Sequence, residues 1–374
     1  MPDHYPAEFT IELATPADDP AIRRLLATNR VPGQIVTTYE REPDYFLGCG
    51  TLGRFCQVII ARHRPSGELA GLACRAVRPL YVNGRVEDVG YLSQLRVDRR
   101  FQGRWLVSRG FHYLHQLHAD RRTSGYLATI IEGSAQASGV LVERPRRHFP
   151  TFRPIGCLWT MALVLRRPQP LPASPYDISH GAAPDLADIV AFLQQHGAAK
   201  HFFPVFSEAD FGDSPTTRDF KPEDFILARR RGELVGVLGL WDQSSYKQTI
   251  VHRYGGALGR FRPLYNLGLR LMGARPLPAP GERIRYIFAS FICTAENNPD
   301  IFDRLLRQAY NLAGTRGYAY LMVGLMAGDP LLAVARRYLH IPYHSRLYTV
   351  AWANEATWAA QLDERPLYLE VAAL

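Results

Sequence analysis

The chain has 374 residues and is 47% hydrophobic and 21% charged, which excludes a disordered or fibrous protein and fits a globular one. This length is more than one hydrophobic core usually serves, so we expect two domains. The formal net charge is +9, and arginine supplies nearly all the basic residues, because the lysines are Lys200, Lys221 and Lys247 alone. The charge favours an anionic partner: nucleic acid, a membrane surface or a phosphorylated cofactor.

No apolar run reaches the roughly 18–20 residues that span a bilayer. The N-terminal segment lacks a basic stretch followed by an apolar core, so the sequence predicts no secretion signal and a cytoplasmic location. The cysteines are scattered and none are spaced C-x-x-C: Cys49, Cys56, Cys74, Cys157 and Cys293. This pattern is typical of small core residues in a reducing compartment, and we expect no metal site.

In chain order, an alternating strand at 9–13 precedes a helix at 14–29 whose first turn is acidic. Two apolar runs within 58–77 flank a Gly-Glu-Leu turn, which predicts a β-hairpin. A strand, a helix, a strand, a shorter helix and a closing strand follow at 86–97, 103–120, 125–132, 134–144 and 156–165.

The second half repeats this order of elements. Its strand, helix and hairpin are expected at 176–180, 182–196 and 225–241, and the five later elements at 283–294, 298–316, 318–326, 328–339 and 345–352. The expected division is an N-terminal domain at 1–167, a proline-rich linker at 168–176, a second domain at 177–353 with an insertion at 253–282, and a tail at 354–374.

The junction "RVDRRFQGRW" at 96–105 joins the strand at 86–97 to the following helix. The order of elements and this junction resemble the GNAT superfamily of acyl-CoA-dependent N-acyltransferases. The signature of that family is an alternating apolar strand followed by R/Q-x-x-G-x-G/A at the start of a helix. Leu95 and Val97 match the strand and Arg100 and Gly103 match the turn, whereas Trp105 stands where the family has Gly or Ala.

The resemblance implies an α+β fold, layered as α/β, of two tandem GNAT-like domains, each a mixed and mostly antiparallel sheet flanked by helices. It also implies acetyl-CoA or another acyl-CoA as co-substrate, and no metal. Helix N-terminal amides bind phosphate, and Gly103 permits close approach of the backbone. The residues expected to bind the cofactor are Leu95, Arg96, Val97, Arg99, Arg100, Phe101, Gln102, Gly103, Arg104 and Trp105.

The corresponding junction of the second half contains no R/Q-x-x-G and carries Glu296 and Asp300 instead. These negative charges would repel a diphosphate. We therefore expect the second domain to be degenerate for CoA and to shape the acceptor site.

Acyl transfer to an amine needs a base, and the family usually takes it from the fourth or fifth strand. Glu132, which ends the strand at 125–132, is the leading candidate, and a helix cap is its alternative role. Tyr91 and Ser134 are further candidates for the site. Some tandem relatives use the carboxylate at the end of the chain, which makes Leu374 a candidate here. Glu87 and Asp88 begin their strand far from this point and rank lower.

The leading hypothesis is an acyl-CoA-dependent N-acyltransferase, in which an amine of an unidentified acceptor attacks the thioester directly. One alternative is a peptidyl transferase that uses aminoacyl-tRNA on the same tandem fold, which the basic charge suits. Another is a non-catalytic acyl-CoA-binding module. No helix-turn-helix or zinc module suggests DNA binding. The insertion at 253–282 either lines the acceptor entrance or packs against another surface, as in a homodimer.

Overall fold

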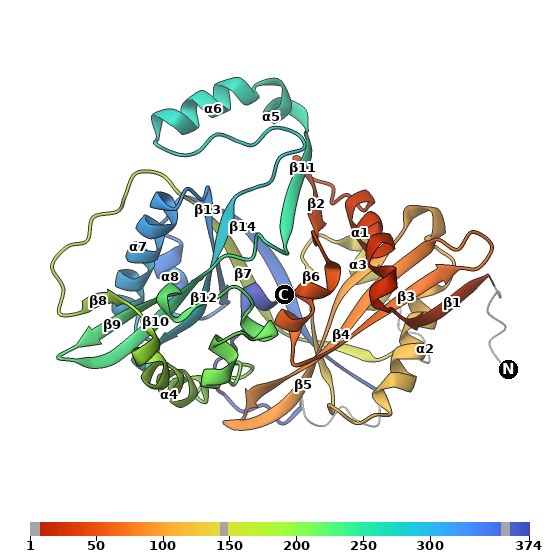
Figure 1. Cartoon of the computed structure of the whole chain (residues 1–374), viewed down its shortest axis with the longest axis horizontal. Coiled ribbons are helices and arrows are strands. Elements are labelled where there is room, and N and C mark those ends of the chain that lie inside the picture. Colours follow the sequence, from red (N-terminus) through yellow and green to blue (C-terminus); the bar gives the residue numbers. More distant parts are fainter. Residues whose placement is uncertain (1–7, 143–148, 353–359) are drawn as a thin grey trace.

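The structure is a computed structural model that describes residues 8–142, 149–352 and 360–374. Its central feature is a twelve-stranded sheet that is mostly antiparallel and carries helices on both faces (Figure 1). The expected fold class, α+β with a mixed sheet flanked by helices, is confirmed. Among the described residues, no helix is long and apolar enough to cross a membrane.

The first half of the chain forms β1 (Phe9–Leu13), α1 (Asp19–Thr28), β2 (Ile35–Glu40), β3 (Phe55–His63), β4 (Leu69–Val82), β5 (Arg85–Val97), α2 (Leu106–His118), β6 (Tyr126–Ile131), α3 (Ala135–Leu141) and β7 (Thr151–Val164). These elements occur in the predicted order, with β2 added. The end of the helix expected at 134–144 lies outside the described residues.

The second half forms β8 (Asp177–His180), α4 (Leu186–Gly197), β9 (Phe225–Arg230), β10 (Glu233–Trp241), β11 (Gln248–Tyr254), α5 (Gly256–Arg260), α6 (Arg262–Leu271), β12 (Tyr286–Thr294), α7 (Pro299–Thr315), β13 (Tyr320–Met326), α8 (Leu331–Ala335) and β14 (His340–Ala351). The helices α5 and α6 lie in the insertion and were not predicted.

Successive side chains of each strand point to opposite faces of the sheet, and helices pack on both faces. On β3, Val58 and Ile60 pack with Leu25 of α1, whereas Ile59 between them packs with Phe111 of α2. The second half repeats this arrangement, since α4 packs on one face of its strands and α7 and α8 pack on the other. Each half therefore has a core on both sides of the sheet.

The two closing strands are exchanged between the halves. The sheet order is β1-β3-β4-β5-β6-β14-β7-β13-β12-β10-β9-β8, so β14 pairs with β6 of the first half and β7 pairs with β13 of the second. The sequence led us to expect each half to close its own sheet. A strand offers the same backbone groups to either neighbour, so local sequence does not select the partner. The exchange joins both halves into one sheet.

A β-bulge interrupts the central strand of each half. On β5 it lies at Gln94, which has a φ of 57°, and on β12 it lies at Phe291, which has a φ of 55°. Bulges increase local twist and redirect the side chains that follow them. Both bulges come just after the strand parts from its parallel neighbour, as a repeated fold requires.

The insertion builds an arm beside the main sheet. Strand β11 pairs with β2 as a separate two-stranded sheet, and α5 and α6 follow it, away from the body of the molecule (Figure 1). The chain then returns along β11, where the amide of Val251 donates to the carbonyl of Glu282 at 3.0 Å, an ordinary hydrogen-bond distance.

Candidate active site

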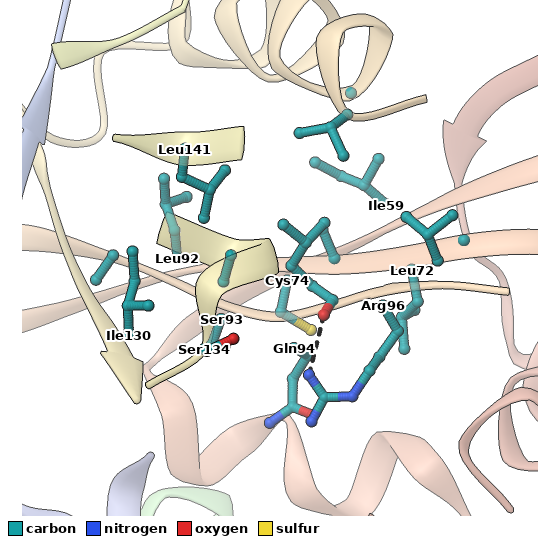
Figure 2. Close-up of a pocket in the computed structure, with 18 of the residues that line it drawn as sticks. Ile59, Leu72, Cys74, Leu92, Ser93, Gln94, Arg96, Ile130, Ser134 and Leu141 are labelled. Atoms are coloured by element: carbon teal, nitrogen blue, oxygen red, sulfur yellow. Dashed lines mark hydrogen bonds between the residues drawn. The ribbon is translucent and has the colours of Figure 1, made fainter. Parts of the chain in front are cut away.

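A cavity opens where β5 and β6 part. The strands pair in parallel from Gly90–Tyr126 to Leu92–Ala128 and then diverge. The cavity has a volume of about 510 Å³ and is bounded by the end of β5, the end of β6 and the first turns of α2 (Figure 2). Beyond Leu92, the edge of β5 that faced β6 is therefore open to a ligand.

The walls of the cavity are mainly apolar, with a few polar groups at the ends of the strands. The apolar residues include Leu72, Leu92, Leu95, Val97, Ile130 and Leu141. Gln94, Arg96 and Ser134 add polar groups (Figure 2). An apolar cavity with few polar groups is typical of a small-molecule site.

Arg96 brings positive charge to the cavity. Its Nη1 donates to the carbonyl of Leu95 at 2.9 Å. Burial lowers the pKa of the Arg96 guanidinium, and the nearby hydroxyls of Tyr39 and Tyr45 oppose this shift. An arginine remains charged in proteins, so Arg96 supplies a cation to an anionic ligand.

The N-terminus of α2 faces the same cavity. A 3₁₀ turn at Arg99–Phe101 follows β5, and α2 begins at Leu106, three residues later than Gly103. Gly103 has a φ of 79° and Trp105 a φ of 63°, both left-handed. Leu106 and Val107 line the cavity, and the amides of a first helical turn have no partner within the helix. This end of α2 can accept an anion.

The predicted cofactor residues separate into two groups. Leu95, Arg96 and Val97 line the cavity, whereas the seven residues from Arg99 to Trp105 do not. Arg100 is paired with Asp98 at 2.9 Å and with Glu68 at 3.1 Å.

The rest of the junction is also engaged within the protein. Arg104 is paired with Glu8 at 3.1 Å. Phe101 is buried, with its ring centroid 5.6 Å from that of Phe9. Gln102 reaches the carbonyl of Val97 at 3.5 Å. Much of the junction's positive charge is therefore balanced by carboxylates.

Of the predicted catalytic residues, Glu132 and Ser134 line the cavity. The Glu132 amide donates to the carbonyl of His344 at 2.8 Å. Its carboxylate accepts from Arg346 Nη2 at 3.3 Å and is 40% exposed. Glu132 therefore stands at the mouth of the cavity with its carboxylate held by β14, a strand of the second half.

Neither Tyr91 nor Leu374 lines the cavity. The Tyr91 hydroxyl is 2.8 Å from the Thr129 hydroxyl, and burial raises the pKa of Tyr91 to about 12. Leu374 packs among core residues, and its carbonyl oxygen accepts from Lys247 Nζ at 3.2 Å. Glu87 pairs across from Leu80, at the opposite end of β5 from the cavity.

The sequence did not identify the helical wall of the cavity. Leu106, Gly110, Phe111 and Leu114 of α2 line it. Their spacing is that of an ordinary buried helix face, so only the missing side chain of Gly110 was a signal. An ideal Cβ on Gly110 would meet no atom within 4 Å, which is consistent with open space there.

In the second half, the chain itself occupies the corresponding space. Strands β12 and β13 pair as far as Ala289–Val323 and then part. The amide of Phe291 donates to Glu370 Oε2 at 2.8 Å, and Val371 packs so closely on Gly324 that an added Cβ would lie 2.6 Å from it. The C-terminal residues 370–373 thus fill the gap between these strands.

The fold is that of the GCN5-related N-acetyltransferases and of N-myristoyltransferase, as the comparison with solved structures shows. One similar structure is a GCN5-related N-acetyltransferase from Sphaerobacter thermophilus, with a TM-score of 0.56, 16% identity and coverage of 92% of this chain and 96% of that chain. No family model matches the sequence, and no curated protein shows significant sequence similarity to it.

Two further structures extend this likeness. Saccharomyces cerevisiae N-myristoyltransferase with bound myristoyl-CoA has a TM-score of 0.62 and 9% identity, and the match covers 92% of this chain and 83% of that chain. A GCN5-related glucosamine N-acetyltransferase region of a fungal multi-domain β-N-acetylglucosaminidase has a TM-score of 0.61 and 14% identity over 92% of this chain and 38% of that chain. The resemblance inferred from the junction is thereby confirmed at the level of the fold.

Proposed function

We propose that the chain is an acyl-CoA-dependent N-acyltransferase and that its first half binds the acyl-CoA. The observation that carries this proposal is the cavity between the parted strands β5 and β6, faced by the N-terminus of α2. The names of the similar structures support it, since they include N-acetyltransferases and an N-myristoyltransferase with bound myristoyl-CoA.

Each part of an acyl-CoA has a suitable partner in this arrangement. The amides of the pantetheine arm can add to the open edge of β5 beyond Leu92, as an extra strand would. The diphosphate can accept from the first amides of α2, whose Leu106 and Val107 line the same cavity as Arg96. The acyl group and thioester then occupy the apolar cavity between Leu92 and Ile130.

The reaction requires an amine nitrogen to attack the thioester carbonyl. A C–N bond forms, the C–S bond breaks, and the ammonium proton passes to a base. Glu132 is the proposed base, because its carboxylate lies at the cavity mouth. The departing thiolate takes a proton from solvent, and the hydroxyl of Ser134, which lines the same cavity, can donate a hydrogen bond to its sulfur.

We assign no acyl-CoA to the second half. Its strands part in the same way, but Glu370 and Val371 fill the space between them. In its junction, Glu296 lies just ahead of α7 and Asp300 lies in the first turn of α7. In this proposal the second half supports the acceptor side, and Arg346 on β14 holds Glu132 in place.

A panel of amines, assayed with acetyl-CoA and myristoyl-CoA by release of free thiol, tests the activity. Once an acceptor is found, Glu132→Gln should lower kcat by roughly 10²–10⁴-fold with little change in KM for acyl-CoA, because it removes the base and leaves the cavity intact.

Glu87→Gln is the matched control, since Glu87 lies on β5 at the far end from the cavity. It should retain wild-type kcat. Equal rates for Glu132→Gln and wild type would remove Glu132 from the mechanism. Binding of acyl-CoA without turnover across the panel would instead indicate a binding module.

A further inference from the structure

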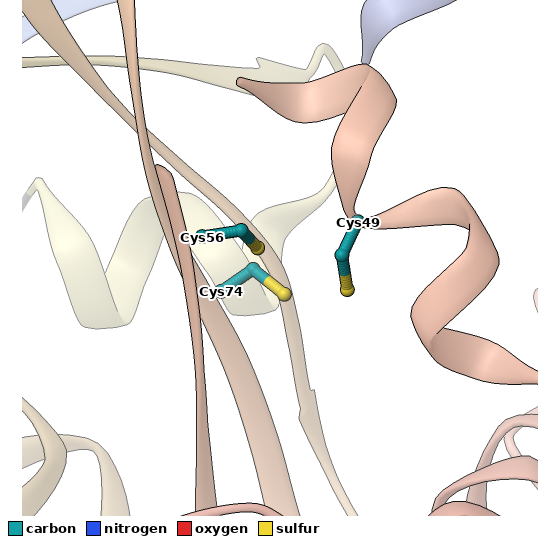
Figure 3. Close-up of side chains that lie close together, drawn as sticks. All are labelled: Cys49, Cys56 and Cys74. Atoms are coloured by element: carbon teal, nitrogen blue, oxygen red, sulfur yellow. The ribbon is translucent and has the colours of Figure 1, made fainter. Parts of the chain in front are cut away.

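Three cysteines that are far apart in the sequence converge beside α1. Cys49 lies between two 3₁₀ turns, Tyr45–Gly48 and Gly50–Leu52, while Cys56 is on β3 and Cys74 is on β4. Their sulfur atoms all lie within 4.8 Å of one another (Figure 3). We call these three residues the thiol cluster.

The sheet explains why two of these thiols share one face. Val58 pairs directly with Cys74 across β3 and β4, and Cys56 is two residues from Val58. Residues two apart on a strand point to the same face, so Cys56 and Cys74 project together toward the segment that carries Cys49. All three are free thiols.

We propose that the thiol cluster binds one Zn²⁺ ion through its three sulfur atoms. Zinc–sulfur bonds are about 2.3 Å long, so two sulfurs on a tetrahedral zinc lie about 3.8 Å apart. The observed separations allow this with small side-chain movements. Thiolates select soft cations over Mg²⁺ or Ca²⁺, and three ligands leave one position for solvent or an added ligand.

The surroundings of the cluster favour a negatively charged sulfur set. The Tyr45 hydroxyl lies 3.0 Å from Cys74 Sγ and can donate to it. Arg41 is only 6% exposed, and its guanidinium lies against Gly48, next to Cys49. Zinc with three thiolates carries one negative charge, which Arg41 balances.

The test uses the reduced, metal-free protein titrated with Co²⁺ and then with Zn²⁺. We expect the absorption bands of a tetrahedral Co²⁺–thiolate site to saturate at one equivalent and to disappear when Zn²⁺ is added. Cys49→Ser should weaken binding by more than roughly 100-fold, since even outer-shell changes cost about 10–100-fold. Each thiol gives up its proton on binding, so affinity should rise with pH.

Cys157→Ser and Cys293→Ser are matched controls outside the cluster and should bind like wild type. Cys49 lies between two turns rather than in the sheet, which makes its variant the one least expected to unfold; circular dichroism checks this. No thiolate band in the wild type, or equal bands in Cys49→Ser and wild type, would overturn the site.

A second and independent observation concerns the arm formed by α5 and α6. The outward face of α6, extended by one residue at each end of the helix, is apolar. Its side chains are 40–70% exposed: Phe261, Leu264, Tyr265, Leu267, Leu271 and Met272. No residue of α6 is buried. In Figure 1 the arm stands clear of the main sheet.

Two polar residues of α6, Arg262 and Asn266, face inward instead. Arg262 Nη2 donates to the carbonyl of Leu277 at 3.1 Å, and the amide of Leu277 donates to Asn266 Oδ1 at 2.8 Å. These bonds fix the helix against its own return segment, so the apolar face is held outward. This orientation is the reverse of an ordinary surface helix, which packs its apolar face on the core.

From this arrangement we infer that the arm docks on an anionic membrane surface. Interfacial helices combine a large apolar face with arginine or lysine around it. The arm carries four exposed arginines, namely Arg253, Arg260, Arg270 and Arg275. Basic residues near an anionic surface strengthen binding to it. A second copy fits this face less well, because pairing two arms would bring the two sets of arginines together.

The test is sedimentation with vesicles of phosphatidylcholine, with and without phosphatidylglycerol. Wild type should bind the anionic vesicles and lose most of that binding at high salt. The triple variant Leu264→Gln, Leu267→Gln, Leu271→Gln should bind more than about tenfold less, because it removes the inserted apolar area. Since none of the three is buried, the variant should fold normally.

The control variant changes three exposed leucines outside the arm, Leu13, Leu171 and Leu339, to glutamine. It should bind vesicles like wild type. Equal binding by the arm variant and wild type would overturn the inference. Absence of vesicle binding by the wild type would also overturn it. Dimerisation of the wild type that the arm variant abolishes would overturn it as well.

Discussion

Replacing Gly110 by tryptophan should weaken acetyl-CoA binding by roughly 100-fold or more, which is about 3 kcal/mol. Gly110 lies in α2 and lines the cavity, and a Cβ there would meet no atom within 4 Å. The indole would occupy the space proposed for the pantetheine arm and acyl group. We expect the variant to fold. Glycine within a helix costs about 0.5–1 kcal/mol of stability relative to alanine, so replacing it does not weaken the helix. Calorimetric titration measures the effect.

Gly314→Trp is the matched control, since Gly314 lies in α7 and its added Cβ also meets no atom within 4 Å. It should bind acetyl-CoA like wild type. If Gly110→Trp bound acetyl-CoA with unchanged affinity, the ligand would not lie in the cavity between β5 and β6.

Replacing Asp120 by alanine should destabilise the protein by about 3–5 kcal/mol, because it leaves a buried guanidinium without its counterion. Arg75 on β4 is fully buried and forms two bonds to the Asp120 carboxylate, of 2.7 and 2.8 Å. Its Nε also donates to the Tyr126 hydroxyl at 2.9 Å. Asp120 is two residues past the end of α2, so the pair fixes the helix that walls the cavity. Urea unfolding measures the loss.

The same pair predicts a pH dependence. Hydrogen bonds from Arg75 lower the pKa of Asp120 to about 2, from an ordinary value of 3.8. The stability that this shift contributes, roughly 2 kcal/mol, is present above pH 3.8 and is lost as the pH falls toward 2. The stability difference between wild type and Asp120→Ala should therefore shrink over that range.

Glu8→Ala is the control for this prediction, since Glu8 and its partner Arg104 are both about half exposed. An exposed pair contributes at most about 1 kcal/mol. An Asp120→Ala protein as stable as Glu8→Ala would show that Arg75 finds other partners.

The order of strands and helices could be predicted from the sequence because each element carries a local pattern. The strand at 86–97 alternates, and the helices at 182–196 and 298–316 have apolar residues at helical spacing. The exchange of β7 and β14 could not be predicted, because it depends on which distant strands meet. The insertion was recognised from its length, while its helices and outward apolar face depend on the bonds of Arg262 and Asn266.

The candidate site was predictable in position more than in detail. Leu95, Arg96 and Val97, which the sequence suggests as cofactor-binding residues, line the cavity, because the end of a strand and the start of a helix are adjacent in the sequence. The pairing of Arg100 with Glu68 and of Arg104 with Glu8 was not visible, since those carboxylates come from other strands and turns.

The thiol cluster shows the same limit. Cys49, Cys56 and Cys74 have no recognisable metal spacing, and only the pairing of β3 with β4 and the fold of the 3₁₀ turns bring them together. The expectation of separate core thiols followed from spacing alone. Convergence in space is a property of the tertiary fold.

Calorimetric titration of the wild-type protein with acetyl-CoA tests the central claim most directly. We predict saturable binding with one site per chain, because the cavity of the first half is open and residues 370–373 fill the corresponding space of the second. Absence of binding to acetyl-CoA and to longer acyl-CoAs, or two equivalent sites per chain, would contradict the account.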